Sequence, residues 1–98
     1  MPRLVILPAA RADLIEIGDF IAQDNPGRAL SFLAELEAKM LQTAERPESF
    51  PACDDVHEGL RSARHGRYLI FFLARVEEVQ IIRVLHGARD LPGIFSGS

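Results

Sequence analysis

The spacing of apolar residues changes from helical to strand-like near residue 60, and this change constrains the fold more than any other feature. In residues 9–45, apolar side chains recur every three or four positions, as on one face of an amphipathic helix. In residues 60–85 the repeat is two, as in half-buried strands. Helices followed by a run of strands predict an α+β fold, with the helices on one face of a sheet.

Two helices are predicted in the first half of the chain, residues 9–23 and 26–45. Asn25 and Pro26 separate them, because asparagine caps a helix and proline suits its first turn. So short a link predicts an antiparallel helical hairpin. Gly18 lies inside the first helix and costs about 1 kcal/mol relative to alanine, so we expect it to mark the close approach of another element.

The predicted strands are residues 3–7, 60–65, 68–76 and 79–85, and the last three are joined by short turns. They predict the order β-α-α-β-β-β, with a helical hairpin on a small, mainly antiparallel sheet. Residues 46–59 contain two prolines and no period, which indicates a loop. At 98 residues the chain is expected to form one domain, residues 1–98, with 96–98 as a frayed tail.

The composition argues against several classes of protein. Cys53 is the only cysteine, and with His57, His65 and His86 it shows no spacing typical of a metal site. No glycine-rich phosphate loop follows the first strand, so we predict neither a metal nor a nucleotide cofactor. No apolar stretch approaches the length of a membrane span, and we expect a cytoplasmic protein.

Charge is distributed unevenly along the chain, whose net charge is −3. Residues 1–58 carry five basic and eleven acidic side chains, a net charge of −6. Residues 59–98 carry six arginines and three acidic side chains, a net charge of +3. This asymmetry suggests that the second half meets an anionic partner, since arginine binds carboxylate or phosphate through a bidentate fork. The alternative is that the acidic helices and the basic sheet pair with each other.

The candidate functional residues are basic. Strict alternation places Arg83 on the face of Val79, Ile81 and Leu85, whereas Gln80, Ile82, Val84 and His86 lie on the other face. Arg83 therefore either has a structural role, bonding an acidic helix residue or carrying its head out to the sheet edge, or faces an anionic ligand. Arg83 and His86 could cooperate in acid–base chemistry only if the strand bends near Leu85. Arg61, Arg64 and Arg67 either protect an edge strand from aggregation or bind a partner.

Several segments together resemble the ParE/RelE superfamily of bacterial toxin–antitoxin modules. Residues 81–92, IIRVLHGARDLP, resemble the final strand and tail of ParE-type toxins. The segments LRS (60–62) and GRYLIFF (66–72) are similar to the preceding hairpin, and PAARADLIEI (8–17) with Asn25-Pro26 to the helical hairpin. The resemblance covers nearly the whole chain, with the pieces in the family's order.

The resemblance implies a toxin of a type II module that arrests growth, stabilises plasmids and is neutralised by a ParD-like antitoxin. ParE-like members poison DNA gyrase without enzymatic activity, whereas RelE-like members cleave mRNA on the ribosome. The lysines and C-terminal tyrosine typical of RelE-like enzymes are missing: Lys39 lies in a predicted helix and Tyr68 begins a different strand. This favours gyrase inhibition over RNA cleavage. The resemblance also implies that the antitoxin's other end binds DNA, so we expect the toxin to meet DNA only through the antitoxin.

The residues expected to bind the target or the antitoxin are Arg61, Arg64, Arg67, Arg83, His86 and Arg89. If the protein were instead a ribonuclease, the candidate catalytic residues would be Arg61, Arg83 and His86.

Overall fold

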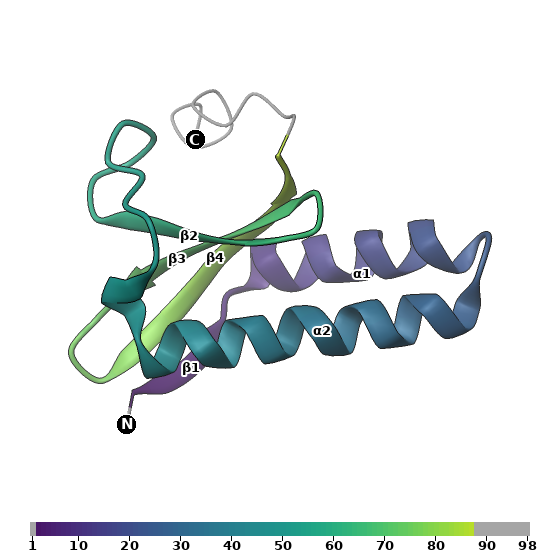
Figure 1. The fold of residues 1–98 in the computed structure, drawn as a ribbon, viewed down its shortest axis with the longest axis horizontal. Helices are drawn as coiled ribbons and strands as arrows, with labels where there is room; N and C mark the ends of the chain where they lie inside the picture. The colour runs from purple at the N-terminus through teal and green to yellow at the C-terminus, as the bar shows by residue number, and fades with distance from the viewer. Residues whose placement is uncertain (1, 88–98) are drawn as a thin grey trace.

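Two antiparallel helices cover one face of a four-stranded sheet (Figure 1). A computed structural model describes residues 2–87, so the predicted tail and Arg89 lie outside the described residues. The elements are β1 (Arg3–Ile6), α1 (Pro8–Ala22), α2 (Pro26–Glu45), a 3-10 turn η1 (Pro47–Ser49), β2 (Leu60–His65), β3 (Tyr68–Ala74) and β4 (Glu78–His86). The predicted α+β class and the order of elements are confirmed.

The sheet has the strand order β1-β4-β3-β2. The pairs β2–β3 and β3–β4 are antiparallel, whereas β1 runs parallel to β4. β1 is short, with Ile6 opposite Ile81, and the Leu7 N–H donates to the Ile81 carbonyl oxygen (3.0 Å). Beyond Ile81, β1 no longer pairs with β4, and this end of the strand meets α1.

The helical hairpin is specified by local signals that the structure confirms. The Asn25 side chain caps α2 by accepting a hydrogen bond from the Arg28 N–H (3.0 Å). Gly18 lies where the helices touch, since a Cβ atom there would be only 3.0 Å from Leu33 Cδ1. In Figure 1 the α1–α2 turn reaches past the end of the sheet.

The core has two parts, one on each face of the sheet. The larger lies between the helices and the sheet and includes Phe32, Leu36, Met40, Ile70 and Phe72. The smaller, on the opposite face, is formed by Leu60, Phe71 and Leu85 with Cys53 and Val56 packed against it. Cys53 and Val56 belong to the segment predicted as a loop. That segment runs along the edge of β2, where the Cys53 N–H donates to the Leu60 oxygen (2.7 Å).

The predicted alternation of β4 is wrong beyond Ile81, because the strand contains a β-bulge. Phe72 lies opposite Ile81 and Phe71 opposite Arg83, so Ile82 is an extra residue. Val84 consequently joins Val79 and Ile81 in the core under the helices, and Leu85 faces the other side. Sequence alternation had assigned Val84 and Leu85 to the opposite faces.

Candidate functional site

A groove of about 850 Å³ lies where the tip of the helical hairpin overhangs the end of the sheet. α1, α2, the β2–β3 turn and the end of β4 all contribute to its walls. Its apolar surface comes mainly from Ile17, Phe20, Ile21, Phe32, Tyr68 and Val84. Phe20 is 66% exposed and is the large apolar side chain most available to a partner in the groove.

The aromatic wall of the groove is tightly connected. The Phe32 ring lies 5.7 Å from the Tyr68 ring and 5.3 Å from the His65 ring. Tyr68 in turn meets His86 edge-on at 5.6 Å. The Arg28 guanidinium lies over the face of Phe32, 5.2 Å from the ring centroid, which is cation–π geometry. These contacts join α2, β2, β3 and β4 into one wall.

Charges of opposite sign line the two sides of the groove. The α1 side carries the acidic side chains Asp13, Glu16 and Asp19. Arg28 and Arg67 line the remaining wall, with His86 beside them. A groove with an apolar floor and oppositely charged sides fits an amphipathic polypeptide better than a uniformly charged polymer.

The Arg83 guanidinium is bound by a carboxylate of helix α1, that of Asp13. Its Nε and one terminal nitrogen donate to the two oxygens of Asp13 (2.7 and 2.9 Å), and Asp13 also accepts the Val84 N–H (2.9 Å). The hydrogen bond that Arg83 donates to Asp13 raises the pKa of the guanidinium above its usual value. Asp13 is only 6% exposed, so this ion pair locks α1 to the end of β4. Of the two interpretations of Arg83, the structure shows the bond to an acidic helix residue.

Glu35 links α2 to the end of β2. Its carboxylate accepts a hydrogen bond from Arg28 (2.6 Å) and lies 2.7 Å from His65 Nε2. The hydrogen bond with Arg28, and after it the one with His65, lowers the pKa of Glu35 to about 2. The pairing holds Arg28 over Phe32 at the rim of the groove.

The three candidate catalytic residues do not converge. Arg61 donates to the Phe50 carbonyl oxygen (2.7 Å), and Arg83 is bound to Asp13. Tyr68 pairs with His65 on one neighbouring strand and with His86 on the other, so His86 lies at the same position along the strands as His65. Arg61 lies four residues before His65 on β2, which places it about 13 Å along the sheet at 3.3 Å per residue.

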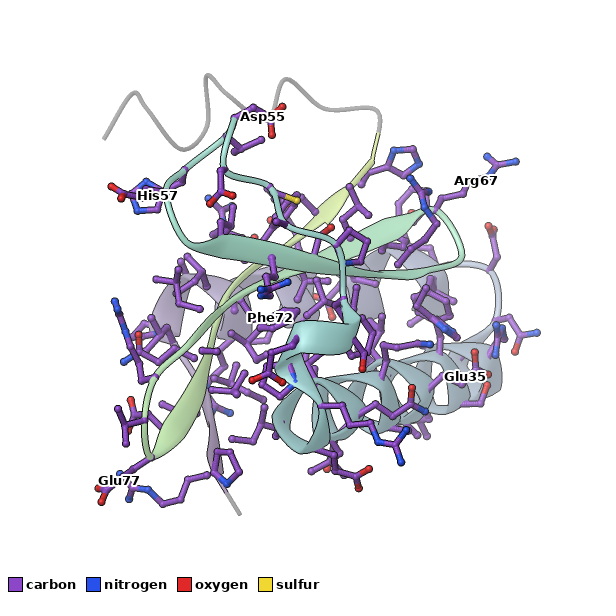
Figure 2. All side chains as sticks on the ribbon, turned by 60° about the vertical axis from the view of Figure 1, so that its left-hand side comes forward. Glu35, Asp55, His57, Arg67, Phe72 and Glu77 are labelled. Carbon is purple, nitrogen blue, oxygen red and sulfur yellow. The ribbon has the colours of Figure 1, made fainter. Side chains whose placement is uncertain are left out.

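Arg64 and Arg67 have exposed side chains at the β2–β3 turn. Figure 2 shows Arg67 pointing away from the protein, at the opposite end of the sheet from Glu77. No hydrogen bond or ion pair within residues 2–87 engages either side chain. These are the sequence-predicted residues whose guanidinium groups remain accessible in the described part of the chain.

Sequence reasoning missed the groove, although one signal for it was visible. Phe20 lies off the apolar stripe of α1, among the acidic residues of the opposite side. An aromatic residue at an exposed helix position is a reason to look for a partner surface.

The fold has a counterpart among solved structures. A chain of the "Chromosomal ParDE TA system from P. aeruginosa" matches with a TM-score of 0.74 and 20% sequence identity, over 88% of this chain and 96% of that chain. The protein is therefore, in fold, a small α+β protein of the kind found in that ParDE system. A comparison with curated proteins finds no match.

A family model identifies the chain more closely. The model described as "ParE toxin of type II toxin-antitoxin system, parDE" matches residues 4–91. The chain belongs to this family, as its sequence segments had suggested. Neither of the helices in the described residues is long and apolar enough to cross a membrane.

Proposed function

We propose that the protein is the toxin of a type II module, that it inhibits DNA gyrase in the cytoplasm, and that a ParD-like antitoxin neutralises it. The observation that carries this proposal is the family match over residues 4–91. Without its antitoxin the toxin is expected to arrest growth, and a plasmid carrying both genes would be retained by its host.

The groove is the surface that best suits the antitoxin. Phe20 and Tyr68 offer apolar contacts. The charges on either side of the groove would fix the orientation of an antitoxin segment that becomes ordered on binding. DNA is a poor ligand for the toxin itself, because the chain has a net charge of −3. Operator DNA would therefore be bound by the antitoxin. Co-purification with a ParD-like protein encoded beside the toxin gene would test this half of the proposal.

Gyrase inhibition is favoured over RNA cleavage by the positions of the basic residues. General acid–base catalysis requires the acid, the base and the phosphate-binding groups around one reacting atom. Arg61 and Arg83 instead donate to Phe50 and Asp13, and His86 lies at a different level of the sheet. The arrangement supports a protein that acts by binding.

The decisive experiment is a supercoiling assay with purified gyrase and relaxed plasmid. The toxin is expected to block supercoiling or to stabilise cleaved DNA, and full gyrase activity at high toxin excess would refute the target. In a translation extract, mRNA is expected to stay intact. Cleavage of mRNA by the wild-type protein would establish the ribonuclease alternative instead.

A further inference from the structure

We infer that Arg64 and Arg67 bind a carboxylate-bearing surface of the target protein, and that the antitoxin silences the toxin by covering Arg67. This inference rests on the proposed function and names the residues that would carry it. It separates two surfaces: the groove, which receives the antitoxin, and a guanidinium patch, defined as Arg64 and Arg67, which meets the target.

The patch is inferred first from which arginines are already engaged. Intramolecular partners hold Arg3, Arg28, Arg61 and Arg83. Arg11, Arg46 and Arg75 are exposed without a partner in the described part of the chain, but they lie singly on α1, after α2 and in the β3–β4 turn. At the β2–β3 turn, two such arginines are three residues apart. Each of these two accessible guanidinium groups can bind a carboxylate of the target through two hydrogen bonds.

Gly87 lies beside both arginines, next to the backbone of Arg67 and the guanidinium of Arg64. The Gly87 N–H donates to the Arg67 carbonyl oxygen (2.8 Å), so the chain leaving β4 passes directly beside the turn. A Cβ atom at Gly87 would be 3.7 Å from an Arg64 terminal nitrogen and 3.5 Å from the Arg67 oxygen. Both distances are ordinary van der Waals contacts, so the Arg64 guanidinium packs directly against the chain at Gly87.

The charges around the patch favour carboxylates over the phosphates of nucleic acid. A duplex presents charge continuously, and one that reached Arg67 would also approach Glu16 and Asp19 across the groove. A protein surface can place one or two carboxylates against the patch without meeting the acidic side. Arginine is also among the residues that dominate binding energy in protein interfaces.

Arg67 belongs to both surfaces, whereas Arg64 belongs to one. Arg67 lines the groove, so a segment in the groove covers it. Arg64 lies opposite Leu69, a residue that packs on the sheet face away from the helices. Neutralisation then follows from direct competition at Arg67, with no change of toxin conformation. Arg64 becomes the position at which target binding can be lost while antitoxin binding is kept.

The test uses Arg64→Glu and Arg67→Glu, with Arg75→Glu as the matched control. Arg75 is also exposed and also in a hairpin turn, at the other end of β3. Each full-length variant is expressed in cells, its abundance is checked by immunoblot and its fold by circular dichroism, and growth is followed. The folded proteins are then compared in the gyrase supercoiling assay and for binding to a labelled duplex.

Both patch variants should relieve growth arrest and raise the half-inhibitory toxin concentration by about tenfold or more, while Arg75→Glu behaves as wild type. If folded Arg64→Glu and Arg67→Glu arrest growth like wild type, the patch is not a target contact. If the wild type itself causes no arrest, the proposed toxin activity is refuted, and the inference with it. Arrest that depends on the patch without gyrase inhibition would keep the inference and remove gyrase as the target. Duplex binding that Arg64→Glu abolishes would overturn the choice of a carboxylate partner.

The antitoxin arm tests the competition. Arg64→Glu should co-purify with the ParD-like protein as well as the wild type does, and Arg67→Glu should co-purify less. Equal retention of the two variants would show that the antitoxin does not act by covering Arg67.

Discussion

Asp13 is the single residue on which the junction of α1 and β4 depends most. Replacing it with alanine leaves the Arg83 guanidinium and the Val84 N–H without their partner. We expect Asp13→Ala to lower the free energy of unfolding by about 3 kcal/mol, since an uncompensated, partly buried charge remains. Urea unfolding followed by circular dichroism would measure this.

Two further variants separate the ion pair from other effects of mutating α1. Asp19→Ala, on the exposed side of the same helix, should change stability by no more than about 0.5 kcal/mol. The double variant Asp13→Ala/Arg83→Met should be less destabilised than Asp13→Ala alone, because no unpaired charge is left. If the double variant is the less stable of the two, the pair does not stabilise the fold in this way.

Glu35 gives the fold an acid-sensitive contact. Its pKa in the folded protein, about 2, lies below the usual 4.5, so the ionised carboxylate is favoured by folding. The stabilisation is therefore complete above pH 4.5 and is lost as the pH falls toward 2. The urea midpoint of the wild type should exceed that of Glu35→Gln at neutral pH, and the difference should disappear across this window.

The Glu35 prediction has a direct spectroscopic check. Carbon-detected NMR titration should place the carboxyl midpoint far below 4.5, and Arg28→Ala should raise it, because Arg28 is the main cause of the shift. High salt should weaken the effect, since the groups are partly exposed. A wild-type midpoint near 4.5 would contradict the pairing.

At the scale of elements, Gly18 sets how closely the two helices approach. Alanine there gains helix propensity, but its Cβ atom would press on Leu33 Cδ1 at 3.0 Å. Gly27 is the matched control in α2, because a Cβ atom there meets only Asn25 Oδ1 at 3.6 Å. We expect Gly27→Leu to change stability by no more than about 0.5 kcal/mol and Gly18→Leu to destabilise by about 2 kcal/mol. Equal stability of the two in thermal unfolding would show that the helix contact is loose.

The elements that local signals determine were predictable from sequence, and the irregular ones were not. The caps at Asn25 and Pro26 and the helical spacing of apolar residues depend on near neighbours in the chain. The bulge at Ile82 could not be located, because Ile81, Ile82, Val84 and Leu85 are all apolar and Arg83, the one charged residue among them, bonds Asp13 of α1 instead of marking a solvent face. The return of residues 51–53 to β2 depends on tertiary hydrogen bonds that carry no sequence period.

The candidate site was predictable in its residue types but not in its geometry. Arginines in the second half were evident from the sequence. Which of them are engaged depends on contacts between distant positions, such as Asp13 with Arg83, 70 residues apart. The groove likewise depends on long-range packing, since its walls come from α1, α2, the β2–β3 turn and the end of β4.

For the molecule as a whole, surface chemistry is divided between its two ends. The end with the hairpin tip and the β2–β3 turn (Figure 1) holds the groove and the guanidinium patch. The other end of β3 holds the β3–β4 turn, where Val76 is 97% exposed. Exposed apolar residues are therefore present at both ends, but of these two side chains Phe20 lines the groove and Val76 does not.

This division predicts which exposed apolar residue the antitoxin requires. Phe20→Asp should abolish co-purification with the ParD-like protein, because it removes an aromatic contact and adds charge to the acidic side of the groove. Val76→Asp makes the same type of change at the far end and should bind normally. Circular dichroism should show both variants folded, since both positions are exposed.

Amide exchange in the complex should show protection in the second half of α1 and the first turns of α2, while the β3–β4 turn exchanges as in the free toxin. Protection confined to the β3–β4 turn, or loss of binding in Val76→Asp alone, would place the antitoxin at the wrong end of the molecule for this mechanism.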